Sequence, residues 1–587
     1  MFKILKYLSS KEWLMIGVSF AFIVTQVWLD LKLPDYMNEI TKIIQTSGAI
    51  SDIWVAGGYM ILCTLGSLVA AIIVGFFAAR IGASFSQRLR SLLFNKVESF
   101  SMEEINRFST SSLITRSTND IIQVQMLIVI ALQLVIKAPI MAVWAITKIA
   151  GKGYEWSMAT AVAVLVILVM VSILMVFVIP KFKKMQTLTD NVTRVTRENL
   201  TGLRVVRAYN AEDYQGKKFE KANKELTDTQ LFTNRAMAVM MPVLMTTLNV
   251  LALAIYWIGA YLVDAAQMLD KIDVFANMVT FSVYAMQVIM SFMMLVIIFI
   301  MWPRASVSAK RINEVLDTTP SIVDGKETQG KLGLIGDVVF NNVSFKYPDA
   351  ADYVLEDISF TAKHGETVAF IGSTGSGKST LINLIPRLFD VTKGEVLIDG
   401  VNVKDYNLEA LYNKIGYVPQ KAVLFKGTVE SNVAYGDNSS VDGFSDDTVK
   451  KAIQIAQGTE FVEKMQDGYN AAISQGGANV SGGQKQRLAI ARAVCRKPEI
   501  YIFDDSFSAL DYKTDRVLRS KLKQETAGVT SLIVAQRIGT IMDADKIIVL
   551  DQGKIVGQGT HKELLRDCLV YKEIAMSQLS EEELTHE

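Results

Sequence analysis

A run of nine residues in the second half of the chain has the composition and spacing of a phosphate-binding loop. It follows the apolar stretch Thr367–Ile371, which predicts a strand, and precedes Leu381–Leu388, which predicts a helix. Glycines at these positions let successive backbone N–H groups surround phosphate oxygens at the N-terminus of the helix. We expect Lys378 to contact the β- and γ-phosphates of a nucleotide, and the Ser379 hydroxyl to ligate Mg²⁺. The complete run is Gly372, Ser373, Thr374, Gly375, Ser376, Gly377, Lys378, Ser379 and Thr380.

A carboxylate that could share the Mg²⁺ ion follows a second apolar run. Ile500–Phe503 has the pattern of a buried strand, and Asp504 comes directly after it. A carboxylate at the end of a strand near a phosphate-binding loop is placed to hold Mg²⁺ through water. Alone this is weak evidence, because an apolar run followed by Asp is common.

Further motifs resemble those of ATP-binding-cassette proteins. Residues 479–487 read Asn-Val-Ser-Gly-Gly-Gln-Lys-Gln-Arg and resemble the signature motif of that family. Tyr347 resembles the aromatic residue that stacks on adenine, and Gln420 resembles the glutamine that senses Mg²⁺. The segment Ser508–Asp511, which ends in Asp511, resembles the loop at the cassette dimer interface. The segment Gly202–Glu212 resembles the second cytosolic coupling loop of exporters. The resemblance covers essentially the whole chain. It implies binding of ATP and Mg²⁺, and contact of a second nucleotide with Ser481, Gly482, Gly483 and Gln484.

Two positions depart from the family pattern, and both concern hydrolysis. Asp505 stands where the family has the glutamate that polarises the attacking water, and Gln536 stands where it has the switch histidine. Asp is one methylene shorter than Glu, and a displacement of about 1 Å can cost roughly a hundredfold in rate. Gln has no titratable imidazole. We therefore expect a degenerate site that binds ATP and hydrolyses it slowly; the alternative is that Asp505 replaces Glu without loss.

The combination of a weakened P-loop site and an intact signature motif predicts a heterodimer. In this family each ATP lies between one chain's P-loop and the other chain's signature motif, so this chain would complete its partner's site. We expect the partner to be a second homologous half-transporter. The alternatives are a homodimeric pump that hydrolyses ATP with Asp505, and a regulatory ATP-sensing membrane subunit. The intact signature motif argues against the regulatory subunit.

The elements that must position these residues fall into two parts of different composition. Half of the 587 residues are hydrophobic, and nearly all long apolar runs precede Pro303. Six runs are long enough to cross a membrane as helices, which needs about 20 residues each. The expected fold is an α-helical six-span transmembrane domain (1–317), a linker (318–336) and an α/β P-loop nucleotide-binding domain (337–587). The six runs are Trp13–Leu29, Trp54–Ala79, Gln125–Ile146, Trp156–Ile179, Ala236–Val263 and Val274–Trp302. We expect Pro303 to end the last span, with a separate short helix over Arg304–Leu316.

The distribution of charge predicts orientation and class of partner. The net charge of +1 does not favour nucleic acid. Lys and Arg gather before the first span and after the second and fourth, so we expect both termini in the cytoplasm and two long helical connections there. The half-transporter layout suggests a bacterial cytoplasmic membrane. Three scattered cysteines form no CxxC pair, which argues against a disulfide framework or a zinc site.

The substrate class is inferred from the membrane spans. We expect export of hydrophobic compounds, such as drugs or lipids; a peptide is the alternative, and an importer is disfavoured because its membrane and ATPase chains are usually separate. Lys137 either lines a transport pathway, or lies near a helix end and extends its ammonium group to the membrane–water interface. Methionines of the last two spans either line an adaptable cavity or pack against lipid and protein: Met237, Met240, Met241, Met245, Met286, Met290, Met293 and Met294.

Overall fold

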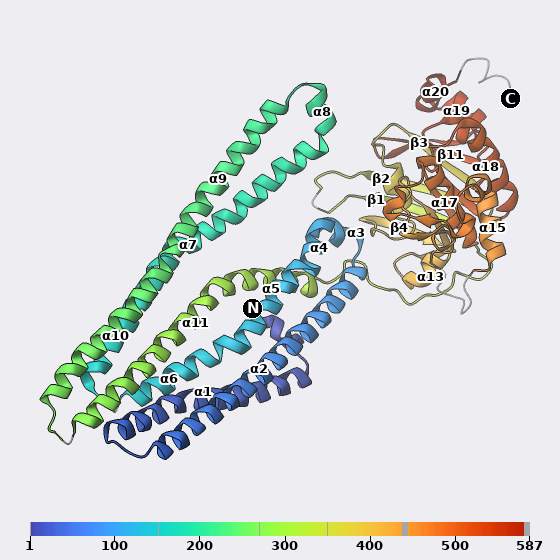
Figure 1. Cartoon of the computed structure of the whole chain (residues 1–587). Helices are drawn as coiled ribbons and strands as arrows, with labels where there is room; N and C mark the ends of the chain where they lie inside the picture. The colour runs from blue at the N-terminus through green and yellow to red at the C-terminus, as the bar shows by residue number, and fades with distance from the viewer. Residues whose placement is uncertain (1, 151, 269, 349, 437–443, 580–587) are drawn as a thin grey trace. The chain divides into compact units, whose positions relative to one another are not determined.

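The computed structural model describes residues 2–150, 152–268, 270–348, 350–436 and 444–579 (Figure 1). The chain divides into two compact units. The first contains Met1–Glu98 and Thr110–Thr318, and the second contains Ser99–Ser109 and Thr319–Glu587. The expected fold class is confirmed, since the first unit is helical and the second has the α/β fold of a nucleotide-binding cassette.

The described part of the first unit contains six helices long and apolar enough to cross a membrane, as the sequence predicts. The two long connections between spans are helical as well, because α2, α7 and α9 extend far beyond their apolar segments. The elements are η1 (Phe2–Tyr7), α1 (Ser10–Gln45), α2 (Ile50–Glu98), α4 (Thr110–Ser117), α5 (Asn119–Ile130), the π-helix η2 (Ala131–Val135), α6 (Lys137–Ile149), α7 (Tyr154–Thr201), α8 (Leu203–Ala208), α9 (Glu212–Ala238), α10 (Met240–Ala265) and α11 (Lys271–Asp317).

The helix of the last span does not end at Pro303, which corrects the expectation of a separate helix after it. Helix α11 continues through Pro303 to Asp317, so residues 304–316 form its end and are not a separate helix. A proline inside a helix removes one backbone hydrogen bond and bends the helix locally. Membrane helices tolerate this because neighbouring groups satisfy the freed carbonyl. Helices α1 and α7 likewise contain Pro34 and Pro180.

The third span is the irregular one. It is divided into α5 and α6 by the π-turn η2, and Lys137 is the first residue of α6. Such π-turns often occur at functional positions in helices. Helix α2 approaches this region closely, because a Cβ atom on Gly82 would lie 2.6 Å from Cγ2 of Val129. Glycine is therefore required at position 82 for α2 and α5 to pack at this separation.

Two sheets form the centre of the second unit. Antiparallel strands make the order β2-β1-β4-β5, and a larger sheet has the order β12-β11-β3-β10-β9-β6, in which all strands except the edge strand β12 are parallel. The strands are β1 (Val338–Phe345), β2 (Leu355–Ala362), β3 (Thr367–Gly372), β4 (Lys393–Ile398), β5 (Val401–Asn402), β6 (Ile415–Val418), β7 (Gly427–Thr428), β8 (Ala472–Ile473), β9 (Ile500–Asp504), β10 (Thr530–Val534), β11 (Lys546–Asp551) and β12 (Lys554–Gly559).

Helices cover these sheets and form a second apolar cluster around the buried face of α17. They are α3 (Met102–Phe108), α12 (Lys378–Asn383), α13 (Leu408–Asn413), α14 (Val429–Val433), α15 (Asp446–Ile455), α16 (Thr459–Glu463), α17 (Gly482–Cys495), α18 (Tyr512–Glu525), α19 (His561–Asp567) and α20 (Leu569–Met576), with short 3-10 turns at Gly468–Asn470, Gln475–Gly477 and Ile538–Thr540. Helix α12 ends at Asn383, earlier than the expected Leu388, because Pro386 disfavours helix at the preceding residue.

The parallel strands bring the candidate residues to one edge. Val534 of β10 pairs with Phe370 of β3 and with Asp504 of β9, so the carboxyl ends of these three strands lie side by side. Ligands of open parallel sheets bind outside the carboxyl ends of the strands. The loops after β3, β9 and β10 carry the P-loop, Asp505 and Gln536.

Candidate nucleotide-binding site

The P-loop connects β3 to α12 through a backbone that only glycine allows at two points. Gly372 lies so close to the Leu550 carbonyl that no Cβ atom fits, and Gly377 has a φ of 96°. The Lys378 ammonium donates to the carbonyl oxygens of Gly372 and Ser373, at 2.9 and 2.7 Å, and to the Ser376 hydroxyl. Burial lowers the pKa of Lys378, and the nearby Asp505 and Asp504 oppose that shift. The loop thus carries one cation enclosed by its own backbone.

Ser379 and Asp504 lie together, as the sequence predicts for a Mg²⁺ site. The Ser379 hydroxyl donates to Oδ1 of Asp504 at 2.9 Å. Burial raises the pKa of Asp504, and the neighbouring Asp505 raises it further. These oxygen donors suit Mg²⁺, which is usually bound through one or two protein ligands plus phosphates and water. Among the described residues there is no group of three or more His, Cys, Asp and Glu side chains that could hold a metal without the nucleotide.

The two unusual residues, Asp505 and Gln536, contact each other. Gln536 Nε2 donates to Oδ2 of Asp505 at 2.8 Å, and Gln420 Nε2 approaches the same oxygen at 3.4 Å. Asp505 is 8% exposed and has a φ of 46°, a left-handed conformation that its N–H stabilises by donating to the Val534 carbonyl. Burial raises the pKa of Asp505, while hydrogen bonds from Gln420 and Ser508 partly oppose it. One carboxylate oxygen is therefore already engaged by amide donors.

The signature motif forms the start of a helix. Ser481 is the N-cap of α17: its hydroxyl accepts from the N–H of Gln484, whose side chain accepts from the Ser481 N–H. Ser481 and Gly482 are exposed at this N-terminus, and Gly483 lies against the Ala509 carbonyl. Gln486, on the same helix, accepts from the Ala509 N–H and so ties α17 to Ser508–Asp511. Hydrogen bonds thus join Ser379 to Asp504, and join Gln420 and Gln536 to Asp505, whereas the signature motif bonds within itself and to Ala509.

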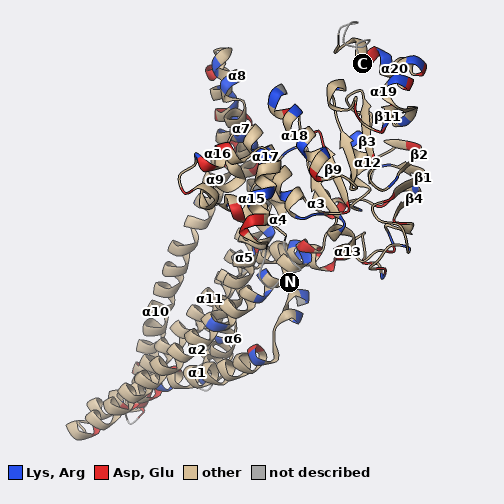
Figure 2. Ribbon diagram, turned by 90° about the vertical axis from the view of Figure 1, so that its right-hand side faces the viewer, with Lys and Arg blue, Asp and Glu red and all other residues tan. Residues whose placement is uncertain are grey.

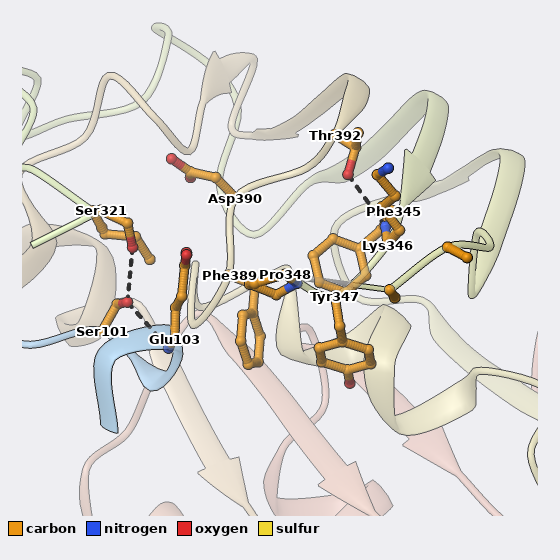
Figure 3. A pocket seen from close by; sticks show the side chains of 13 residues that line it. Ser101, Glu103, Ser321, Phe345, Lys346, Tyr347, Pro348, Phe389, Asp390 and Thr392 are labelled. Atoms are coloured by element: carbon orange, nitrogen blue, oxygen red, sulfur yellow. Dashed lines mark hydrogen bonds between the residues drawn. The ribbon is translucent and has the colours of Figure 1, made fainter. Parts of the chain in front are cut away.

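Tyr347 lines a pocket of about 440 Å³ (Figure 3). Phe345 and Phe389 contact the Tyr347 ring edge to face, and its hydroxyl lies 3.0 Å from Oγ1 of Thr380 in the P-loop. The volume is within the range of about 300–1,000 Å³ typical of small-molecule sites. The lining residues are Ser101, Glu103, Ser321, Ile322, Phe345, Lys346, Tyr347, Pro348, Ala350, Ala351, Phe389, Asp390 and Thr392.

Two family models match the chain. The model for the ABC transporter transmembrane region matches residues 16–292, and the model for the ABC transporter domain matches residues 355–508. A Mycobacterium tuberculosis protein named as an uncharacterized ABC transporter ATP-binding protein is 42% identical over 450 residues, 76% of this chain and 75% of its own length. The chain belongs to the ABC transporter family. The family and its ATPase domain imply a multi-pass membrane protein that uses ATP and Mg²⁺ to drive transport.

Further relatives cover about two thirds of this transporter, and one solved structure covers 97% of it. The Bacillus subtilis protein YfiB, an uncharacterized ABC transporter ATP-binding protein, is 38% identical and covers 68% of each chain. An ATP-dependent lipid A-core flippase of Pseudomonas fluorescens is 36% identical over 65% of this chain and 62% of its own length. A bacterial Atm1-family ABC exporter with ATP bound superposes with a TM-score of 0.82 at 22% identity, covering 97% of this chain and 99% of that one. This transporter therefore has an exporter half-transporter fold.

The transporter also holds charged residues inside its membrane unit. Lys137 forms an ion pair with Asp30 at 3.0 Å, with side chains 15% and 19% exposed, and Ser67 donates to the same carboxylate. Lys137 does lie at a helix end, but its amine contacts Asp30. Lys148 and Asp35 form a second ion pair between the same two helices, α6 and α1, whereas Figure 2 draws α10 almost entirely without charged residues. Met241, Met245, Met286 and Met290 are exposed, whereas Met240 and Met293 pack against the apolar core of the unit.

Sequence reasoning missed the contribution of α3 to the pocket of this transporter. Ser101 and Ser321 are 220 positions apart, yet their hydroxyls lie 2.9 Å from each other at the pocket wall. The pattern Ser-x-x-Glu at Ser101–Glu104 is a capping box, which indicates a helix start and nothing about a nucleotide. Only the fold shows that this short helix lines the same pocket as Tyr347.

Proposed function

We propose that this chain is one subunit of an ATP-driven exporter of hydrophobic compounds, of the drug or lipid class. Its own P-loop site would bind Mg²⁺ and ATP and hydrolyse ATP slowly. The observation that carries the proposal is the 2.8 Å hydrogen bond between Gln536 and Asp505.

This bond bears directly on hydrolysis. A carboxylate that polarises water must be free to accept the proton or hydrogen bond of that water. Asp505 is shorter than the family's glutamate, and Oδ2 already accepts from Gln536. Gln536 cannot titrate and cannot supply the hydrogen bonds of an imidazolium. Both residues therefore weaken the same step, whereas Lys378, Ser379 and Asp504 retain the chemistry needed to bind Mg²⁺ and phosphate.

The signature motif supports assembly with a second, homologous half-transporter. The motif lies at the exposed N-terminus of α17. The backbone N–H groups there and the helix dipole favour binding of an anion such as a γ-phosphate. A homodimer would combine two slow sites, but a heterodimer would place one intact signature motif on a partner's full site. Hydrolysis at that site would then drive the transport cycle. ATP retained in the slow site would keep the two cassettes in partial contact.

Substrate and location follow from the membrane unit. Exposed methionines on α10 and α11 are flexible and apolar, which suits adaptable contact with hydrophobic compounds. The lipid named for the related flippases is consistent with that class. Relatives from Mycobacterium, Bacillus and Pseudomonas support a bacterial cytoplasmic membrane. The cation-rich connections support cytoplasmic termini.

The test compares the two sites of the assembled transporter. ATP turnover is measured for this chain alone and for the complex with its co-purified partner, with Asp505→Ala here or the corresponding glutamate replaced in the partner. Loss of turnover from the partner's change, with most activity kept in Asp505→Ala, is the expected result. Brisk hydrolysis by this chain alone through Asp505 would instead establish a homodimeric pump and refute the proposal.

A further inference from the structure

The loop that carries Gln536 is held by one side chain from the turn after α20. Gln578 donates from Nε2 to the carbonyl oxygen of Gln536 at 2.9 Å. Its Oε1 accepts from the N–H of Ile538, also at 2.9 Å. The two contacts span 42 and 40 positions of the chain. A single amide group thus bonds the main chain on both sides of Arg537.

The local conformation of the loop makes this double contact possible. Arg537 is extended, with φ of −104° and ψ of 128°. In an extended segment, the carbonyl of one residue and the N–H of the second residue after it point to the same side. The Gln578 amide therefore pairs with the carbonyl of Gln536 and the N–H of Ile538 as a neighbouring strand would. Two bonds fix both the position and the direction of the loop, which one bond does not.

Gln578 is itself presented by a packed helix. Tyr571 and Ala575 of α20 are fully buried in the same apolar cluster as Ile538. Gln578 continues that face, because its spacing from these two residues is that of successive helical turns. Its N–H donates to the Ala575 carbonyl at 3.1 Å. The Tyr571 hydroxyl lies 2.6 Å from Nδ1 of His561, which begins α19. The amide is thus anchored on the cassette core.

The bond between Gln536 and Asp505 depends on this anchor. The side chains of Gln536 and Arg537 are exposed, so packing does not fix them. Gln536 Nε2 reaches Oδ2 of Asp505 at 2.8 Å. A shift of the loop by about 1 Å would take this contact beyond hydrogen-bonding distance. The position of the main chain at Gln536 therefore decides whether that carboxylate oxygen is occupied.

We propose that Gln578 is a positioning residue of this chain's ATP site, which holds Gln536 on Asp505 and so helps to keep hydrolysis there slow. The inference rests on the proposed function, because it requires that the bond between Gln536 and Asp505 slows hydrolysis. Both side-chain bonds of Gln578 go to the main chain of the loop, so Gln578 acts on Asp505 through Gln536.

The test separates the rate of hydrolysis from the affinity for ATP. Full-length transporter in lipid nanodiscs, with hydrolysis at the partner's site abolished, is given Mg²⁺ and ATP. Gln536→Ala should raise the hydrolysis rate of this chain's site about fivefold, since one hydrogen bond contributes about that much. Gln578→Ala should raise the rate about threefold, because the loop keeps its other contacts, and should leave ATP affinity unchanged. In the double variant the rate should not exceed that of Gln536→Ala alone.

A second variant and a matched control separate positioning from general loosening. Gln578→Glu keeps an acceptor for the Ile538 N–H but has no donor for the Gln536 carbonyl, so it should act like Gln578→Ala. Ser577→Ala removes a hydrogen bond to the Ile574 carbonyl in the same turn and should leave the rate unchanged.

Several results would overturn the inference. They are an unchanged or lower rate in Gln578→Ala, a threefold rise that persists in the Gln536→Ala background, and weaker ATP binding in Gln578→Ala. If Gln536→Ala itself leaves the rate unchanged, the proposed slow site fails and the inference fails with it. If Gln536→Ala raises the rate and Gln578→Ala does not, the inference alone fails.

Discussion

A partly buried carboxylate in the membrane unit and a buried one in the cassette are compensated by different chemistry. Asp30 in the membrane unit pairs with the Lys137 ammonium at 3.0 Å. Asp505 in the cassette accepts from the amide of Gln536 at 2.8 Å, while its nearest acidic neighbour, Asp504, adds negative charge. An ion pair removes the net charge from a region of low dielectric, but an amide donor leaves it in place. The membrane carboxylate is therefore neutralised by a direct ion pair, whereas the charge of Asp505 is opposed from nearby by the cations Lys378 and Arg537.

Breaking the membrane ion pair should have the largest effect. Lys137→Met leaves Asp30 without its counter-ion among apolar helices, and we expect a loss of about 3 kcal/mol in stability. The double change Asp30→Asn with Lys137→Met should recover most of that loss. Thermal unfolding of the four forms in nanodiscs measures the coupling. Equal stability of Lys137→Met and the unchanged chain would show that the pair contributes nothing.

Restoring both family residues in the cassette should accelerate hydrolysis there. Asp505→Glu together with Gln536→His should raise turnover at this chain's site roughly a hundredfold, since a well-placed general base contributes about 10²–10⁴. Each single change should give far less than half of that gain, because the two side chains contact each other. Vanadate trapping of nucleotide in this chain, with the partner's site inactivated, reports the outcome. If each single change raised turnover by a factor and the two factors simply multiplied in the double variant, the result would contradict a contact between the two side chains.

Neutralising Asp505 should stabilise the nucleotide-free chain, in contrast to the change Lys137→Met in the membrane unit. The folded-state pKa of Asp505 is raised above its usual value, so ionisation destabilises the fold as pH rises through that raised pKa. Asp505→Asn should thus raise the free energy of unfolding by about 1 kcal/mol at neutral pH, because the carbonyl oxygen of the new side chain still accepts a hydrogen bond from Gln536. The gain should vanish below the unfolded-state pKa near 3.8, where both forms are neutral. The free energy of unfolding of the unchanged chain and of Asp505→Asn, measured across pH, checks the sign of this effect.

The smallest effect is expected at the exposed ion pair between Glu460 and Lys464. Their side chains are 82% and 72% exposed at a separation of 2.6 Å. Water and salt screen such a pair, so Glu460→Gln should leave the stability of the chain almost unchanged. The same unfolding measurement at low and high salt provides the check. A loss comparable to that of Lys137→Met would mean that burial does not distinguish the two ion pairs.

Local patterns in the sequence predicted a large part of this molecule. The apolar runs predicted the six spans, and the β3–P-loop–α12 order followed from Thr367–Ile371 and the glycines after it. Such features depend on residues close together in the chain, so composition and periodicity reveal them. The expectations that were wrong concern helix ends: α11 passes through Pro303, and α12 stops at Asn383. A proline alone therefore does not decide where a helix ends, because α11 continues through Pro303 whereas α12 ends before Pro386.

The sequence by itself determined which residues could bind phosphate and Mg²⁺, and that Asp505 and Gln536 depart from the family pattern. Only the tertiary structure decided which of these side chains contact each other. The contact between Asp505 and Gln536 and the pairing of Lys137 with Asp30 each join segments far apart in the chain. The same holds for the pocket that Ser101 and Tyr347 line together. Long-range contacts depend on how whole helices and strands pack, and the pattern of neighbouring residues does not encode them individually.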